Sequence, residues 1–550
     1  MKSFGNIRLF RFFIYLLVFN IKWVIAPGKP YDDGPMEYEG DVEALGGDIK
    51  LWWFVPRTKY MKDEDFSREF HTELKKFAVK HGGSVEHVYR SHSDYLGTLY
   101  FSIKLSFLYD PDELWIAHRK NLLSYGEVPH TEHSKIQNHV DVKNAKAKAK
   151  PSTPSLLENL GKNVTLVTRA TGPGFERVID PKNVEVFEEP FEDLQKMSQP
   201  KGVPLSELRG QYYRRAAKGQ GSTVYLIDTG AWVSETLKHK ELSEIRLVDY
   251  LSAGPDPGTD IIDSWPAFYH GTKVLSRIAG RRLGTAPLAD IVVVRSVNKF
   301  HYSSVAHVLD AILRVYDHLV RTKPKFAVLN ISMNFPTGDL SGGYMTGNKD
   351  IIQKIHKKYD YPDASPKQEA TGVLTTPEVV IKLTRYLVSE IEKLGNAKIV
   401  TCTNNDKNAP KGILPASEMI GYPKTVVVVG STGLDDKSIY QYWDKVRVYA
   451  PSSNVMVATY DIDGSPTLLP EDGVSFATGT VSGMLATFVS EGVPIDDAVE
   501  HLYKLAHSRK PPNVKDPEGH YAPIAFNGVE EIEWPLTVGD QEGLEEYILP

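Results

Sequence analysis

The sequence predicts an α/β protein: a parallel sheet with helices on both faces, preceded by a small α+β unit of the ferredoxin-like kind. Five short runs dense in Val and Ile alternate with helical patterns between about residues 190 and 510. Continuous apolar runs are typical of strands covered on both faces, as in a parallel sheet. A separate β-α-β-β pattern occupies residues 45–130, and 550 residues are more than one compact core usually holds.

The small unit begins with a strand and a helix. Residues 49–55 form a strand-like apolar run, and within residues 66–77 apolar side chains recur at helical spacing. Residues 84–89 and 99–105 are predicted as the two following strands. This order is compatible with a ferredoxin-like unit.

The large unit, residues 191–510, is predicted from strands that alternate with helices. The clearest helix is 377–394, which Gly395 ends. Alternation of this kind predicts a parallel sheet covered by helices. The predicted strands are 224–227, 291–294, 327–331, 398–402 and 425–429.

The remaining segments have other compositions. Three basic residues precede the apolar run 12–19, which is too short to span a bilayer and is typical of a signal peptide. We therefore assign residues 1–26 to a signal peptide and expect a secreted protein. Residues 131–190 contain Lys, Pro and small residues and are expected to form a cleavable linker. Residues 511–550 end in an acidic run and are expected to form a solvated tail.

Composition excludes several kinds of partner. The net charge of -6 provides no basic footprint for nucleic acid. No later segment approaches membrane-spanning length, so stable membrane insertion is not expected. Cys402 is the only cysteine, which makes an intramolecular disulfide impossible, and its apolar context predicts a buried packing role.

Two kinds of short motif concern processing and modification. Arg214-Arg215 is a dibasic pair that a processing protease would recognise, but it precedes the strand at 224–227 so closely that a structural role is favoured. Of the two Asn-x-Ser/Thr sequons, Asn163 lies in the linker, where a glycan is acceptable. Asn330 lies in a strand expected to be buried, where no modification is expected.

Three motifs place reactive side chains at strand ends or helix starts. Asp228-Thr229-Gly230 follows the strand 224–227, His270-Gly271-Thr272 opens a helical run, and Ser475 lies in Gly473-Val474-Ser475-Phe476-Ala477 before a segment rich in small residues. Ligands bind outside the carboxyl ends of strands in open α/β sheets. Each motif alone is weak, because Asp turns, surface His and Ser helix caps are common.

Together these residues form a complete chemical set. A serine hydroxyl needs a base to attack an amide. His270 would take the proton of Ser475, and Asp228 would hold the imidazole in the correct tautomer. The developing oxyanion needs fixed donors, which the side chain of Asn405 and the backbone N–H of Ser475 would supply.

The order Asp228, His270, Ser475 resembles that of the subtilisin-like serine proteases and differs from the chymotrypsin and α/β-hydrolase orders. Further segments across about residues 190–510 resemble the same family. Leu329-Asn330-Ile331-Ser332-Met333 is similar to the strand that lines its main specificity pocket, and Thr403-Asn404-Asn405 is similar to the loop that carries its oxyanion Asn.

The resemblance implies a secreted serine endopeptidase that acts on polypeptides. It assigns substrate binding to Ser332, Met333 and Asn334. It also implies that residues 45–130 are a propeptide, which helps the enzyme fold and blocks its active site until it is cut away, by self-processing within about residues 130–195. Members of the family often bind calcium, but no calcium ligand is assigned, and no other metal or cofactor is expected.

The chain departs from the family pattern near the site. Val474 stands where Thr is usual and Gly479 where Pro is usual, and Gly479 is expected to loosen the start of the helix that presents Ser475. Asn334 and Asn404 replace glycines, which predicts an altered pocket and narrow specificity.

Two other functions are consistent with parts of the sequence. Asp-Thr-Gly is also the signature of aspartic proteases, but that chemistry needs two such carboxylates and no second motif exists in the chain. The departures around Ser475 favour a weak or inactive subtilisin-like protein that acts as a binding module. The presence of all three catalytic candidates and Asn405 favours the enzyme, and a probe that labels activated serines would separate the two.

Overall fold

The structure is a computed structural model. It describes residues 49–81, 83–106, 111–127, 184–188, 191–233, 239–254, 269–297, 303–333, 376–408, 414–461, 465–511, 513–516 and 520–530. All of these belong to one compact unit, Leu45–Pro550. The predicted signal peptide and most of the predicted linker lie outside the described residues.

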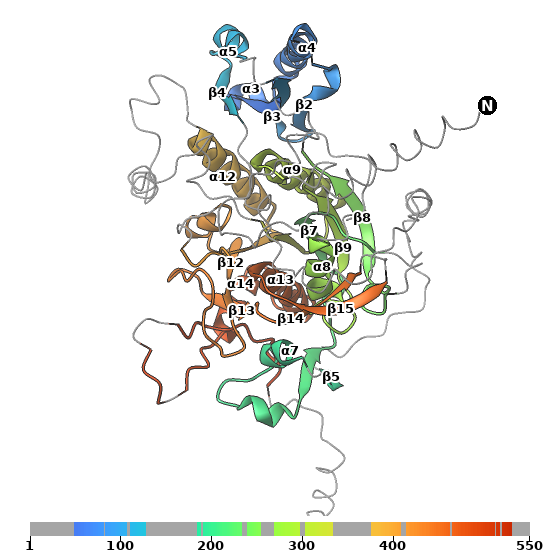
Figure 1. The fold of residues 1–550 in the computed structure, drawn as a ribbon, viewed down its shortest axis with the longest axis vertical. Helices are drawn as coiled ribbons and strands as arrows, with labels where there is room; N and C mark the ends of the chain where they lie inside the picture. Colours follow the sequence, from blue (N-terminus) through green and yellow to red (C-terminus); the bar gives the residue numbers. More distant parts are fainter. Residues whose placement is uncertain are drawn as a thin grey trace, which may run out of the picture. The chain divides into compact units, whose positions relative to one another are not determined.

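A seven-stranded parallel sheet lies at the centre of this unit (Figure 1). Its strand order is β13-β12-β11-β10-β7-β9-β8, and every neighbouring pair is parallel. The strands are β7 (Thr223–Asp228), β8 (Arg246–Ser252), β9 (Asp290–Arg295), β10 (Ala327–Ile331), β11 (Ala397–Cys402), β12 (Val426–Thr432) and β13 (Val448–Pro451). The predicted parallel sheet is confirmed.

Helices cover both faces of the sheet. Tyr225 and Ile227 of β7 pack into a core with α9 (Val305–Thr322) and α12 (Thr376–Leu394). The alternate residues Val224 and Leu226 pack on the other face, with α8 (His270–Ala279) and α13 (Val474–Ser490). Successive side chains of a strand point to opposite faces, and here both faces are apolar, as the Val- and Ile-rich runs predict.

The N-terminal part has the order βαββαβ. Its four strands form an antiparallel sheet in the order β2-β3-β1-β4, as in a ferredoxin-like unit. The predicted strand at 84–89 begins later, at Val88, because the Ser84 side chain accepts the N–H of Glu86 and starts a 3₁₀ turn. The elements are β1 (Ile49–Pro56), α3 (Thr58–Met61), α4 (Glu64–Lys80), η1 (Val85–His87), β2 (Val88–Ser93), β3 (Gly97–Ser106), α5 (Asp112–His118) and β4 (Leu122–Glu127).

One face of the N-terminal sheet packs against α9 and α12. Trp53 and Tyr100 belong to the same hydrophobic core as the inner faces of these helices. Polar contacts add to it: Tyr89 and Ser91 each donate a hydroxyl hydrogen bond to the carboxylate of Asp310 on α9, at 2.7 and 2.5 Å. The N-terminal sheet and the helices on one face of the large sheet are therefore packed into one hydrophobic core.

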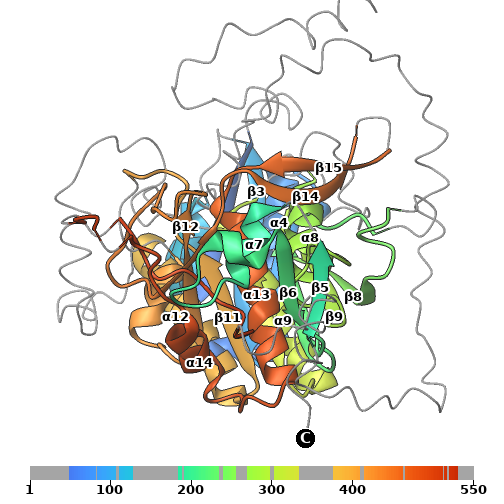
Figure 2. The same ribbon diagram turned by 90° about the horizontal axis from the view of Figure 1, so that it is seen from below.

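The segment before β7 is also part of the fold. Strand β5 (Val184–Glu188) pairs with β6 (Gln211–Arg215), and α7 (Glu192–Met197) lies beside β6 (Figure 2). Helix α7 also contacts β13. Arg214 donates to the carbonyls of Arg281 and Gly284, at 3.0 and 2.8 Å. The dibasic pair therefore lies in a paired strand, as the structural interpretation expects.

The C-terminal segment differs from the expected tail. Ile524, Phe526 and Val529 are buried, and the N–H of Asn527 donates to the carbonyl of Met197 at 2.9 Å. Residues 522–529 are thus packed against the body, so a solvated tail cannot begin at residue 511. The alternating apolar residues of 522–529 are the sequence feature that indicates a buried segment here.

The smaller elements of the large unit connect these layers. They comprise a hairpin beside α8, two 3₁₀ turns and a C-terminal helix that contacts α13. Their bounds are η4 (Leu205–Leu208), η5 (Ala416–Ile420), β14 (Val455–Tyr460), β15 (Pro466–Glu471) and α14 (Ala498–Leu505).

Candidate active site

Asp228 is the last residue of β7 and is fully buried. Its Oδ1 accepts hydrogen bonds from the N–H of Thr229 and from Nδ1 of His270, both at 2.7 Å. The backbone N–H of Ser296, just after β9, donates to the carbonyl of Asp228 at 2.9 Å. The neighbouring strand thereby fixes the backbone from which the carboxylate projects.

His270 is the first residue of α8 and lies against the turn that follows β7. The N–H of Gly271 donates to Oγ1 of Thr229 at 3.0 Å. A Cβ at position 271 would lie 1.9 Å from the carbonyl oxygen of Gly230, so only glycine permits this approach. The His-Gly-Thr motif is therefore used for packing as well as for its imidazole, and it brings His270 onto Asp228.

Ser475 lies in the first turn of α13 and is buried. Its hydroxyl donates to the carbonyl of Ser332, directly after β10, at 3.3 Å. The ring of its neighbour Phe476 lies 5.9 Å from that of His270, between ring centres. The contact to Ser332 places the hydroxyl of Ser475 at the carboxyl end of β10.

Asn405 follows β11 and is oriented toward the start of α13. Its Oδ1 accepts the N–H of Val474 at 2.9 Å. This contact uses the acceptor end of the amide, so the NH₂ end is not engaged by Val474. Strands β11, β10 and β7 are neighbours in the sheet, and the residues at or just after their carboxyl ends include Asn405, Ser332 and Asp228.

The predicted substrate-binding residues have different placements. Ser332 is buried, and its hydroxyl accepts a hydrogen bond from Asn330 at 2.9 Å. Met333 is also buried, and its Sδ lies 3.5 Å from Oγ of Ser296. Asn334 lies outside the described residues. Asn404 uses its side-chain oxygen to accept the N–H of Asp406 at 2.8 Å, so it shapes its own loop.

Asn330 connects β10 to α13. Its side-chain nitrogen donates to Ser332, and its side-chain oxygen accepts the hydroxyl of Ser482 at 2.9 Å. The residue is fully buried in the middle of the sheet, as expected for this sequon. Its amide therefore helps to hold the helix of Ser475 over the strand that precedes Ser332.

Helices α8 and α13, which begin at His270 and Val474, cross in close contact. A Cβ at Gly479 would lie 3.0 Å from the carbonyl oxygen of Val274 and 3.3 Å from Cβ of Arg277. The expectation that Gly479 loosens the helix is thus incomplete, because this glycine allows the two backbones to approach. Sequence reasoning missed this role, although Gly479 and Gly483 are separated by one helical turn, as at close helix crossings.

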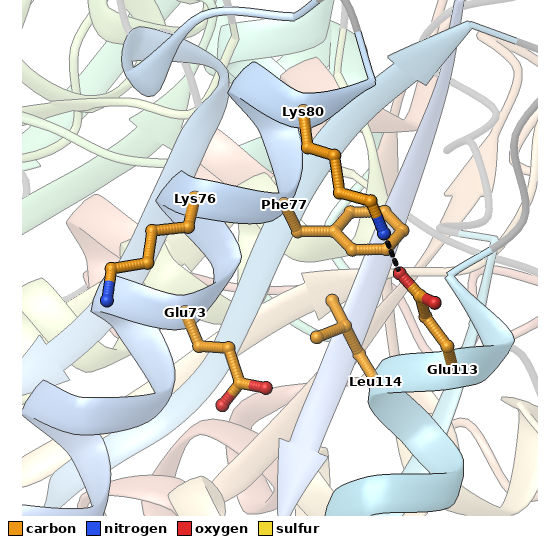
Figure 3. A pocket seen from close by; sticks show the side chains of 6 residues that line it. All are labelled: Glu73, Lys76, Phe77, Lys80, Glu113 and Leu114. Carbon is orange, nitrogen blue, oxygen red and sulfur yellow. Dashed lines mark hydrogen bonds and ion pairs between the residues drawn. The ribbon is translucent and has the colours of Figure 1, made fainter.

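The described structure also has a surface hollow away from the candidate site. This hollow between α4 and α5 mixes both charges, and Lys80 and Glu113 pair across it at 3.0 Å (Figure 3). Across the described ranges, no three His, Cys, Asp or Glu side chains gather to hold a metal ion. None of the helices in those ranges is both long and apolar enough to cross a membrane. The hollow is lined by Glu73, Lys76, Phe77, Lys80, Glu113 and Leu114.

The fold and these contacts define a class of protein: an α/β protein that brings an Asp–His pair and a helix-start Ser to the carboxyl end of a parallel sheet. No protein-family model matches the chain. Among curated proteins it is similar to Subtilisin-like protease 1 of Pseudogymnoascus destructans, 25% identical over 321 residues, and to Subtilisin-like protease 2 of Trichophyton verrucosum, 24% identical over 347 residues. These matches cover 58% and 62% of this chain. The curated relatives that the chain matches are thus named subtilisin-like proteases.

The matched segments span 64% and 67% of the lengths of these two relatives. Among solved structures, the chain is similar to a cold-adapted subtilisin-like serine proteinase, with 20% identity and a TM-score of 0.42 over 62% of this chain and 99% of that one. It is also similar to the epidermin leader peptide processing serine protease of Staphylococcus aureus, with 13% identity and a TM-score of 0.48 over 87% of this chain and 98% of that one.

Proposed function

We propose that the protein is a serine endopeptidase that hydrolyses peptide bonds with Ser475 as nucleophile, His270 as base and Asp228 as the partner of the base. One observation carries the proposal: His270 Nδ1 and Asp228 Oδ1 are 2.7 Å apart, and α8 packs closely against the helix that presents Ser475. An imidazole held at Nδ1 by a buried carboxylate keeps Nε2 as its proton acceptor.

The reaction would proceed in two stages. Oγ of Ser475 attacks the scissile carbonyl carbon while Nε2 of His270 takes the hydroxyl proton. The C–N bond then breaks, the proton passes to the leaving amine, and an acyl-enzyme remains. Water, deprotonated by the same imidazole, then attacks the ester carbonyl. The bond from the acyl carbon to Oγ of Ser475 breaks, the imidazolium returns its proton to that Oγ, and the acid product is released.

Two donors would stabilise the negative oxygen of each tetrahedral intermediate. They are the side-chain NH₂ of Asn405 and the backbone N–H of Ser475 at the start of α13. The contact between Oδ1 of Asn405 and the N–H of Val474 supports this assignment, because it fixes the amide without using its donors. Pre-aligned donors lower the barrier because they do not have to reorganise during the reaction.

We further propose that the protein is a secreted, self-processing proenzyme. Residues 45–130 would be the propeptide and 131–190 the region that contains the cleavage site. The apolar run 12–19 supports secretion. The packing of the N-terminal sheet on α9 supports a folding role for the propeptide, because the two parts bury apolar surface together.

The test is the intact mass of the secreted wild type beside Ser475→Ala. If the wild type loses about its first 130–190 residues and the variant stays whole, Ser475 is the nucleophile of a self-processing enzyme. If both stay whole, each is treated with an unrelated protease. Hydrolysis by the trimmed wild type then shows that an activator was missing, and its continued failure to hydrolyse substrate shows that activity is absent. Failure of an activated-serine probe to label the trimmed protein would support the binding-module alternative.

A further inference from the structure

Arg277 lies two turns after His270 on α8 and is only 1% exposed. Residues seven apart lie on the same face of a helix, so Arg277 extends from the side of α8 that carries the imidazole. A buried guanidinium is costly unless its charge and its N–H groups find partners. Its partners therefore reveal what this charge holds together.

Those partners come from three separate elements. Nη2 of Arg277 lies 2.7 Å from Oδ2 of Asp193 on α7, and Asp193 is itself 2% exposed. Nε donates to Oγ1 of Thr480 on α13 at 3.2 Å, and Nη1 donates to the carbonyl of Met456 on β14 at 3.1 Å. One side chain thus joins the helix of His270 to α7, α13 and β14, which lie around it in Figure 2.

The contact with α13 leads directly to the candidate nucleophile. Oγ1 of Thr480, which accepts from Arg277, donates in turn to the carbonyl of Phe476 at 3.1 Å. Phe476 is the residue after Ser475, and its ring faces that of His270. The guanidinium is therefore connected to the two catalytic candidates through Thr480 and Phe476, which lie one turn apart on α13.

We propose that Arg277 is a positioning residue that sets the spacing between the helices of His270 and Ser475, with Asp193 of α7 supplying its counter-charge. The inference rests on the proposed function and deepens it: the docking of α7 completes the catalytic arrangement. No reacting atom touches Arg277, so its effect is on the orientation of the imidazole and the hydroxyl.

Packing leaves little freedom for this spacing. The would-be Cβ of Gly479 lies 3.3 Å from Cβ of Arg277, so the arginine stem fills the seam between α8 and α13. Loss of the guanidinium would leave Thr480 and Met456 without their donor and let the seam relax. Small displacements of catalytic groups cost large factors in rate, on the order of 100-fold for 1 Å.

The experiment compares Asp193→Asn, Arg277→Met and the double variant in the full chain. The readouts are kcat and KM on a peptide substrate, together with the thermal midpoint. Breaking a buried ion pair destabilises, whereas replacing both partners by neutral groups restores much of the stability. We expect both single variants to lose thermal midpoint, and the double variant to regain it while its kcat stays about 10- to 100-fold low with KM little changed.

Arg282→Met is the matched control. Arg282 also pairs with a buried carboxylate, Glu241, at 2.6 Å, but it lies beyond the C-terminal end of α8, away from His270. It should lower the thermal midpoint without lowering kcat. If the double variant recovers both thermal midpoint and kcat, the pair is only structural and the proposal is overturned.

Two further measurements test the positioning role if Arg277→Met does not fold or if the protein is inactive. If Arg277→Met does not fold, Arg277→Lys is measured instead, because it keeps the positive charge but not the planar guanidinium with its several donors. A full wild-type kcat in Arg277→Lys would refute the positioning role. If the wild type and Arg282→Met show neither hydrolysis nor probe labelling, the proposed function has failed. The low-field proton resonance of His270 Nδ1–H, measured in the Ser475→Ala chain, then decides: Arg277→Met should shift or abolish it, and an unchanged resonance overturns the positioning role.

Discussion

Replacing Gly479 with alanine tests how tightly the helices that carry His270 and Ser475 are packed. The added Cβ would lie 3.0 Å from the carbonyl oxygen of Val274, a backbone atom that can move only with α8. Alanine gains about 1 kcal/mol over glycine in helix propensity. Overpacking at such a contact costs about 1–3 kcal/mol. We therefore expect a net loss of about 1 kcal/mol in the free energy of unfolding.

The effect on the reaction should exceed the effect on stability. A shift of α8 moves His270 relative to Ser475, so we expect kcat to fall about 10-fold with KM nearly unchanged. Gly483→Ala provides a graded comparison, because its Cβ would lie 2.2 Å from Oγ1 of Thr285 and 2.9 Å from the carbonyl oxygen of Ile278. It should cost about 3 kcal/mol or more.

Gly395→Ala is the control for this series. Gly395 ends α12 with φ +74° and has no heavy atom within 4 Å of its would-be Cβ. Alanine there introduces backbone strain of about 1 kcal/mol without a clash, so the thermal midpoint should fall and kcat should not. A Gly479→Ala enzyme that is more stable than wild type and fully active would refute the tight crossing.

Three other predictions concern separate parts of the chain. Asn405→Ala should lower kcat about 100- to 1000-fold with little change in KM, and an unchanged rate in steady-state assays would contradict the oxyanion role. Burial, with two nearby cations, lowers the pKa of His71 from 6.5 to about 4, so the stability that neutral His71 contributes is present above pH 6.5 and is lost as the pH falls toward 4. His71→Gln should therefore reduce the fall of the thermal midpoint over that pH range. An unaltered pH dependence of the thermal midpoint would exclude His71 as the cause of the fall. Arg215→Ala removes the ion pair with the mostly buried Glu491, in which the two groups are 3.3 Å apart, and should cost about 3 kcal/mol; an equal thermal midpoint would show that the pair is dispensable.

Much of the central sheet could be predicted because its strands carry strong local signals. The run at 327–331 coincides with β10, and the runs at 224–227 and 291–294 lie within β7 and β9. Strand β8 was missed because its sequence Arg-Leu-Val-Asp-Tyr-Leu-Ser mixes charges with apolar residues, and one face of this edge strand is exposed. Strand β13 was missed because four residues give too short a pattern.

The candidate site was predictable for a different reason. Asp228, His270 and Ser475 each lie in a short motif whose position at a strand end or helix start is visible locally. The buried pair of Asp193 and Arg277 has no such signal, because its members lie 277 - 193 = 84 residues apart and each resembles an ordinary helix-surface charge. Only the folded structure brings these two side chains to 2.7 Å from each other.

If the protein is secreted, as proposed, the buried position of Asn330 has a consequence for its folding. Its amide nitrogen meets Ser332, its oxygen meets Ser482, and β10 lies between two other strands. An oligosaccharide on that nitrogen would prevent the strand from entering the sheet. The sequon would thus be open to sugar transfer only while the chain is unfolded, so sugar at Asn330 would mark molecules that folded too slowly.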